Sequence, residues 1–248
     1  PVRSADRGDE HPVVAAGGWQ QGFQLVGGAT LVVALLVGVL LIRSHPGDVG
    51  LHVHGVHDPF EEAHKDDTGL PAQAALRSPQ FAALMLGLTL FSGIMALQQH
   101  FPALMADRGL DLAAAGSLLS LLSVVNVVTT LLLGNLSDRL GPLIAYAVSG
   151  GLLVAALVLF LVSVGYAPQA AAILLFSIPA VTPPILTPIL LRHTFGGRPF
   201  VSLLGVATAT MPAGIALASP LWGLSKDLTG SYNAALLTAI ALTVLIVV

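Results

Sequence analysis

The distribution of charged residues constrains the fold of this chain more than any other feature of its sequence. Asp, Glu, Lys and Arg are absent from six long stretches, at 11–42, 78–106, 112–137, 140–191, 199–225 and 228–248. A bilayer core about 30 Å thick is crossed by about 20 apolar helical residues, so each stretch can hold a span. The stretch 140–191 can hold two, and Gly165-Tyr166-Ala167-Pro168 predicts the break between them. The sequence therefore predicts seven spans.

The apolar stretches predict helices, because they are nearly continuous and lack the residue-by-residue alternation of a membrane β-barrel. Only 9% of the residues are charged and 55% are hydrophobic, which excludes a soluble globular protein. We therefore expect an all-α membrane protein with seven transmembrane helices. It would be a multi-pass protein of the cell (inner or plasma) membrane, with the lipid bilayer as one partner.

Several other classes of function are excluded by the sequence. A net charge of −3 without a basic cluster argues against nucleic-acid binding. The absence of cysteine excludes thiolate metal sites. His52, His54 and His57 have a spacing that could bind zinc, but they lie in a Gly-containing polar stretch, so we interpret them as part of a solvated loop and expect no metal. No motif of a hydrolase, metalloprotease or nucleotide-phosphate site occurs, so we expect neither an enzyme nor a cofactor.

The spacing of the apolar stretches divides the chain into three parts. The predicted spans lie near 22–42, 79–101, 112–136, 143–164, 168–191, 200–223 and 231–248. We expect residues 1–43 to be the truncated end of an N-terminal half with one transmembrane helix, 44–78 to be a polar linker between bundles, and 79–248 to form a six-helix bundle. Because the chain starts at Pro1 and ends in apolar residues, we expect it to be a piece of a longer protein.

Orientation follows from the Lys and Arg residues between the spans, since cytoplasmic loops carry an excess of them. One side would receive Arg43, Lys65, Arg77, Arg139, Arg192 and Arg198, and the other Arg3, Arg7, Arg108 and Lys226. We therefore place the linker 44–78 and the connections 137–142 and 192–199 in the cytoplasm.

A signature stands between the third and fourth predicted spans, where the sequence reads Gly134-Asn135-Leu136-Ser137-Asp138-Arg139-Leu140-Gly141. It resembles the G-x-L-x-D-R-x-G motif of the major facilitator superfamily, in the cytoplasmic loop after the second or eighth helix. The resemblance implies helices six to twelve of a twelve-helix transporter, whose first helices would be a further partner. It also implies a gating motif made of Gly134, Asp138, Arg139 and Gly141, in which Asp138 and Arg139 hold one conformation of the transport cycle.

Further stretches resemble the monocarboxylate-porter and oxalate/formate-antiporter branch of that superfamily. They are Arg43-Ser44-His45-Pro46-Gly47-Asp48-Val49-Gly50-Leu51, His100-Phe101-Pro102 with Asp107-Arg108-Gly109-Leu110, Phe195-Gly196-Gly197-Arg198-Pro199-Phe200 and Asp227-Leu228-Thr229-Gly230-Ser231-Tyr232. The chain departs from the branch in two places. Pro142-Leu143 replace the basic residues that follow the signature, and Thr129-Thr130 replace an Arg that can meet a carboxylate.

Two groups of polar residues within the spans are candidates for solute binding, since polar side chains at bilayer depth are costly without a cavity or partner. Ser123, Asn126 and Thr130 recur at three- and four-residue steps and share one helix face, which either lines a cavity or bonds to a neighbouring helix. Gln98, Gln99 and His100 end the second predicted span, where they either contact solute or lie at headgroup depth.

The fifth predicted span contains Pro179, Pro183, Pro184 and Pro188. Each interior proline removes a backbone hydrogen bond, and interrupted helices can form hinges in transporters. Pro179, Pro183 and Pro184 are therefore a candidate hinge. The alternative is a static kink, with Pro183-Pro184 ending one helical segment.

Taken together, these features predict a secondary active transporter that moves a small solute by alternating access. The solute would be a monocarboxylate, another organic anion, or a neutral or amphipathic molecule. The alternative is a membrane sensor or binding protein that kept the fold without transport.

Overall fold

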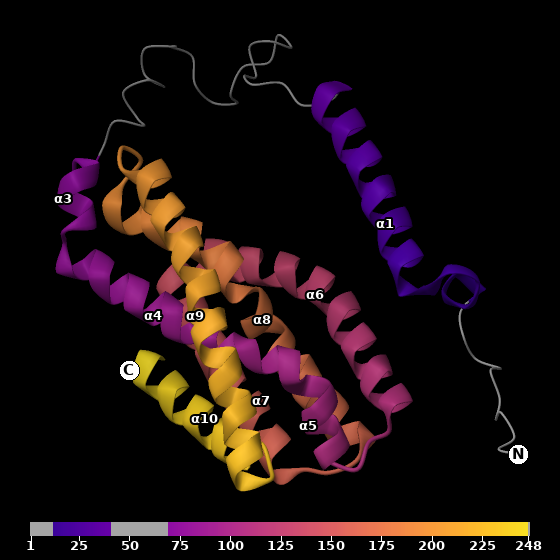
Figure 1. Ribbon diagram of the computed structural model, residues 1–248. Coiled ribbons are helices and arrows are strands. Elements are labelled where there is room, and N and C mark those ends of the chain that lie inside the picture. The colour runs from indigo at the N-terminus through magenta and orange to yellow at the C-terminus, as the bar shows by residue number, and fades with distance from the viewer. Residues whose placement is uncertain (1–11, 41–68, 248) are drawn as a thin grey trace, which may run out of the picture. The chain divides into compact units, whose positions relative to one another are not determined.

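The computed structural model describes residues 12–40 and 69–247, and all of their regular secondary structure is helical (Figure 1). The chain divides into two units, Pro1–Pro59 and Phe60–Val248. In the first unit, α1 spans Pro12–Leu40. The large apolar side chains from Phe23 to Val39 of α1 are exposed within its unit, as expected for a span that meets lipid or other spans.

The second unit is a bundle of helices joined by short turns. Its elements are α3 (Ala72–Leu76), α4 (Pro79–Met95), the 3₁₀ helix η2 (Ala96–His100), α5 (Phe101–Asp107), α6 (Leu112–Leu140), α7 (Pro142–Val162), α8 (Tyr166–Phe195), α9 (Phe200–Thr229) and α10 (Asn233–Val247). The linker predicted over 44–78 lies mostly outside the described residues. Its described end contains α3, in which Ala75 is fully buried, and Gly69 forms an antiparallel bridge with Gly196.

Six helices among the described residues are long and apolar enough to cross a membrane. They are Gln20–Val39 within α1, Pro79–Asp107, α6, α7, α8 and α9. The seventh predicted span, 231–248, corresponds to α10, whose 15 residues rise only about 22 Å at 1.5 Å per residue. The described helix is thus shorter than the predicted span.

The second predicted span ends later than its sequence indicated. We predicted an end at 101, before Pro102, but the helical path continues through η2 and α5 to Asp107. Pro102 stands in the first turn of α5, where a missing N–H costs nothing in the new helix. His100 therefore lies seven residues before the end of the span and not at its end.

The tight turns at each end of α7 are made by glycines in a left-handed conformation. Gly141 (φ 87°) is the single residue between α6 and α7, and Gly165 (φ 87°) precedes α8. An L side chain is strained at such a φ, so glycine permits these sharp reversals. The break predicted near 165–168 is confirmed.

The core of the bundle holds a cluster of aromatic side chains. The rings of Phe101 and Phe176 are 4.9 Å apart between centroids, and those of Phe101 and Phe160 are 5.1 Å apart. These rings join α5, α7 and α8. A second close approach joins α4 and α9, because Gly93 and Gly214 face each other where the helices cross. A Cβ at Gly214 would overlap the Thr89 carbonyl oxygen, so only glycine permits this crossing.

Candidate functional site

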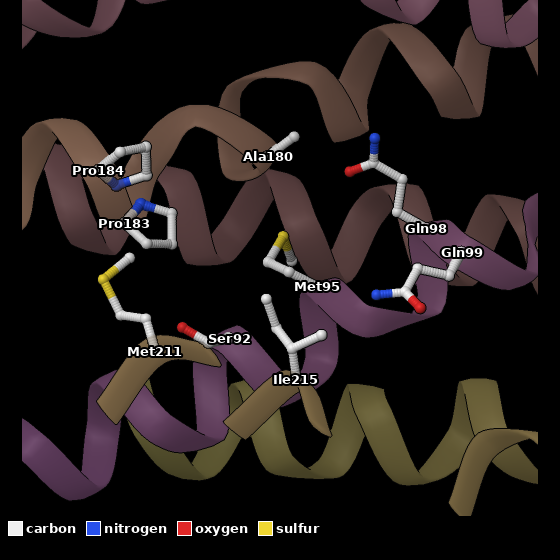
Figure 2. Close-up of a pocket in the computed structure, with 9 residues that line it drawn as sticks. All are labelled: Ser92, Met95, Gln98, Gln99, Ala180, Pro183, Pro184, Met211 and Ile215. Carbon is white, nitrogen blue, oxygen red and sulfur yellow. The ribbon is translucent and has the colours of Figure 1, made fainter. Parts of the chain in front are cut away.

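A cavity of about 420 Å³ lies between α4, η2, α8 and α9 (Figure 2). It is lined by Ser92, Met95, Gln98, Gln99, Ala180, Pro183, Pro184, Met211 and Ile215. Its volume is within the range of about 300–1,000 Å³ that small-molecule sites occupy. The structure therefore brings two predicted solute-binding residues, Gln98 and Gln99, together with two predicted hinge residues, Pro183 and Pro184.

Three polar side chains reach this otherwise apolar cavity. Ser92 is only 2% exposed, and its Oγ has no hydrogen-bond partner among the described residues. Gln98 is half-buried and Gln99 is exposed. None of the nine lining residues carries a charge. Two thioethers, two prolines and aliphatic groups form the remaining wall, so the cavity combines hydrogen bonding with apolar contact.

The third residue of the predicted group, His100, lies beside the cavity and not in its lining. Its Nε2 is 3.1 Å from the Ser219 carbonyl oxygen, and its Nδ1 is 3.2 Å from the Tyr232 hydroxyl. A carbonyl oxygen can only accept, so Nε2 donates to Ser219, and in the tautomer with its one proton on Nε2 the Nδ1 atom accepts from the Tyr232 hydroxyl. His100 thus connects η2 to α9 and to the turn before α10.

Tyr232 is suited to this donor role. Its side chain is buried, and this burial raises the pKa of its hydroxyl above the ordinary value. The hydroxyl therefore keeps its proton at neutral pH. Around it, Lys226 forms an ion pair with Asp107, and Arg108 donates to Asn233. These contacts hold the ends of α5, α9 and α10 together.

The predicted face on α6 is separate from the lining of this cavity. Ser123 and Thr130 are exposed, and their hydroxyls donate to the carbonyl oxygens of Leu119 and Asn126 in their own helix. Asn126 is half-buried, and its Oδ1 is buried without a partner among the described residues. Of the three, only Asn126 has an unmet need for a hydrogen bond, so it remains a candidate for solute contact.

The proline-rich helix α8 is continuous from Tyr166 to Phe195. The alternative in which Pro183-Pro184 end a helical segment is therefore wrong. Pro179 and Pro183 are buried, while Pro184 is exposed. The Thr182 hydroxyl donates to Ile178 and meets the Ser149 hydroxyl of α7, which holds α8 against its neighbour. Whether Pro179, Pro183 and Pro184 act as a hinge stays a prediction.

The predicted gating motif lies in the last turns of α6. Gly134 is half-buried, whereas Asp138 and Arg139 are exposed, and neither is paired with a described residue. Gly141 ends the helix, and its N–H donates to the Ser137 carbonyl oxygen. The motif therefore belongs to a helix end and not to a loop, with its two charged side chains available to residues outside this bundle.

Several lining residues were not predicted from the sequence. Ser92 stands seven residues before Gln99, and this spacing places both on one face of a helix. This spacing alone could have indicated that Ser92 faces the same side as Gln99. The lining residues Met211 and Ile215 recur on α9 at a four-residue step that continues to Ser219 beside the cavity, but an apolar stripe with one serine is equally typical of helix packing.

Six long apolar helices among the described residues define this chain as a multi-pass membrane protein, and its second unit holds a partly polar cavity. The family model described as Major Facilitator Superfamily matches residues 12–189, which is more than half of the chain. The chain belongs to the major facilitator superfamily, a family of membrane transporters and not of enzymes. No curated protein matched the chain.

Proposed function

We propose that this protein is a secondary active transporter that moves a small solute by alternating access, and that the cavity between α4, η2, α8 and α9 is this bundle's share of the solute site. The proposal is supported chiefly by the unpartnered Ser92 Oγ in that cavity. A buried polar atom without a partner is costly, so it indicates a ligand that supplies the missing bond.

The two sides of the cavity suggest how it could open. α8 forms one wall as an unbroken helix. The other wall includes η2, and a 3₁₀ stretch within a longer helix often marks a hinge. We propose that η2 bends while α8 moves as a unit. The predicted hinge at Pro179, Pro183 and Pro184 is the competing version of this step.

Asp138 and Arg139 are the proposed gate. They lie at the end of α6 on the side that we predict to be cytoplasmic, and both are exposed on this bundle. An exposed carboxylate there can pair with the positive N-terminus of a helix outside the bundle, and that pair would stabilise one conformation.

The branch of the superfamily and the solute are also proposals. The stretches around Arg43, Asp107, Arg198 and Asp227 favour the monocarboxylate-porter and oxalate/formate-antiporter branch. The uncharged lining of the cavity favours a neutral or amphipathic solute over an anion. The uncharged lining thus argues against a carboxylate, the solute that the resemblance to this branch implies.

A membrane sensor on the same fold is the second candidate function, and one observation favours it. Pro142 and Leu143 occupy the positions after Gly141 where basic residues usually complete the gating motif. A protein that binds solute without cycling would not need those charges.

Uptake into proteoliposomes that contain the purified full chain separates the two functions. The assay would screen neutral and anionic small molecules, each with and without a proton gradient. Transport predicts uptake of at least one solute and its loss in Asp138→Ala. Asn135→Ala is the matched control, because Asn135 is exposed on the same turn but is not part of the motif. Binding without uptake of any solute would support the sensor.

A further inference from the structure

We propose that the cavity selects an uncharged, largely apolar solute that offers oxygen acceptors to Ser92 and Gln99, and that Ser219 orients Gln99 for this contact. The inference rests on the proposed function, since it names the class of solute for the same site. It is carried by a chain of hydrogen bonds that leads from Tyr232 through His100 and Ser219 to the cavity.

The proton positions along this chain follow from what each atom can do. His100 Nε2 donates to the Ser219 carbonyl oxygen, so this nitrogen cannot also accept from the Ser219 hydroxyl, 3.4 Å away. The hydroxyl proton is therefore free for another acceptor. The Gln99 Oε1 lies 3.3 Å from the Ser219 Oγ and accepts this proton.

This bond fixes the orientation of the Gln99 amide. With Oε1 engaged by Ser219, the Nε2 group with its two N–H donors turns to the opposite side. Figure 2 shows the Gln99 nitrogen pointing toward the side of Met95 and Ile215, and the oxygen pointing away from it. Gln99 therefore offers donors to the cavity, and its acceptor is already used.

Ser92 supplies the second donor. Its hydroxyl is 98% buried and unpaired among the described residues, and it lines the same cavity on the same face as Gln99. A solute with carbonyl, ether or hydroxyl oxygens would satisfy both groups. Met95, Met211 and Ile215 would contact its apolar part.

The lining also indicates which solutes are excluded. A carboxylate could accept from the same donors, but no lining residue carries the positive charge that would offset its loss of water. An ammonium group could donate to the Ser92 hydroxyl oxygen but would meet no carboxylate in the lining to offset its loss of water. An uncharged solute avoids both penalties, so charge is the property on which the site discriminates.

Three probes of nearly equal shape test this inference: benzamide is neutral, benzoate is an anion and benzylammonium is a cation. The measurement is the melting temperature of the purified full chain in detergent, because a ligand that binds the folded state raises it. We expect benzamide to raise it and the two charged probes to have little effect. Equal or greater stabilisation by benzoate, or no stabilisation by any probe at millimolar concentrations, would overturn the inference.

Variants assign the effect to the two donors. Benzamide has a single oxygen, so the variant that removes the donor to this oxygen, Ser92→Ala or Gln99→Leu, should weaken benzamide binding about two- to tenfold. Gln99→Glu should lose benzamide and gain benzylammonium, which a merely unstable variant would not do. Gln80→Leu is the control, because Gln80 is exposed on α4 and does not line this cavity. Unchanged benzamide binding in both Ser92→Ala and Gln99→Leu would contradict the assignment.

Ser219 is tested as a positioning residue. Ser219→Ala should weaken benzamide binding, because the Gln99 amide is then free to turn its donors away from the cavity, and Ser219→Thr, which keeps the hydroxyl, should restore it. Loss of protein stability without any change in benzamide binding would leave Ser219 only a structural role and would overturn this part. These readouts need no flux, so a chain that prefers benzamide but transports nothing contradicts the proposed function alone. A chain that transports but prefers benzoate contradicts the inference alone.

Discussion

The two walls of the cavity respond in opposite ways to proline. α8 contains Pro179, Pro183, Pro184 and Pro188 and remains one helix of 30 residues. The opposite wall has a single proline near its break, Pro102, and it changes from α-helix to 3₁₀ helix over Ala96–His100. The number of prolines therefore does not locate the irregular part of this bundle.

The difference lies in the partners of the affected carbonyl groups. Pro102 cannot donate to the Gln98 carbonyl oxygen, and the Phe101 N–H bonds to it instead through a 3₁₀ turn. One turn earlier, the indole N–H of Trp222 on α9 donates to the Gly93 carbonyl oxygen at 2.8 Å. In α8, buried packing against α6 and α7 keeps the helix straight enough to continue. Tertiary contacts thus decide whether a proline breaks a helix.

The largest effect on stability is expected where α4, the helix that leads into η2, crosses α9. Gly214→Ala places a Cβ against the backbone of Thr89, and this backbone can move only if the helices separate. We expect a loss of about 1–3 kcal/mol in unfolding free energy, as for an overpacked core. Thermal or denaturant unfolding in detergent measures it. Gly205→Ala is the control on the same helix, since nothing lies within 4 Å of its Cβ, and an equal loss there would show that the crossing is not special.

The two walls are compared directly by replacing their prolines. Pro102→Ala supplies an N–H that can make an α-helical bond to the Gln98 carbonyl oxygen in place of the 3₁₀ bond from Phe101, so it should favour a regular helix and slow the bending of η2. We expect uptake to fall about tenfold, which corresponds to about 1.4 kcal/mol in the barrier. Pro184→Ala on the opposite wall should change uptake less than about twofold, or about 0.4 kcal/mol. The reverse order would favour the hinge predicted at Pro179, Pro183 and Pro184.

Removing the Trp222 hydrogen bond should have a smaller effect. Trp222→Phe loses the bond to the Gly93 carbonyl oxygen beside the 3₁₀ segment, and a net loss of about 1 kcal/mol is expected for one neutral hydrogen bond. The melting temperature in detergent measures it. Tyr166→Phe removes an exposed hydroxyl that meets Ser117, so it should cost less. If both variants lost the same stability, Trp222 would not be a specific support of η2.

The smallest effect on stability is expected at the end of α5, which follows η2. Lys226→Met breaks the ion pair with Asp107, in which both side chains are 27% exposed. Such pairs contribute about 0–1 kcal/mol and are screened by salt. Stability measured at low and high salt should show a small loss that shrinks as salt rises. A large, salt-independent loss would mean that this contact contributes far more to holding α5 on α9 than an exposed ion pair does.

The sequence predicted the helices of the bundle and the break at Gly165 because charge spacing and glycine turns are local signals. It also indicated Gln98 and Gln99, polar residues in an apolar run, as candidate solute contacts; both line the cavity, and their contact with solute stays a prediction. It did not predict η2, because the contact of Trp222 with Gly93 joins residues 129 positions apart. His100 was placed at the end of its span because a helix that begins near Pro79 has crossed about a full bilayer by position 100. Ser92 was missed because a single serine in an apolar helix commonly bonds to its own backbone.

The central claim is that the cavity between the two walls is reached in turn from both sides of the membrane. The chain contains no cysteine, so Met211→Cys introduces a single thiol into the cavity lining. The direct measurement is its modification by a membrane-impermeant thiol reagent, added to either side of proteoliposomes with the chain in one orientation. Alternating access predicts reaction from both sides, with Asp138→Ala shifting the ratio of the two rates. Reaction from one side only, unchanged by Asp138→Ala, would contradict it.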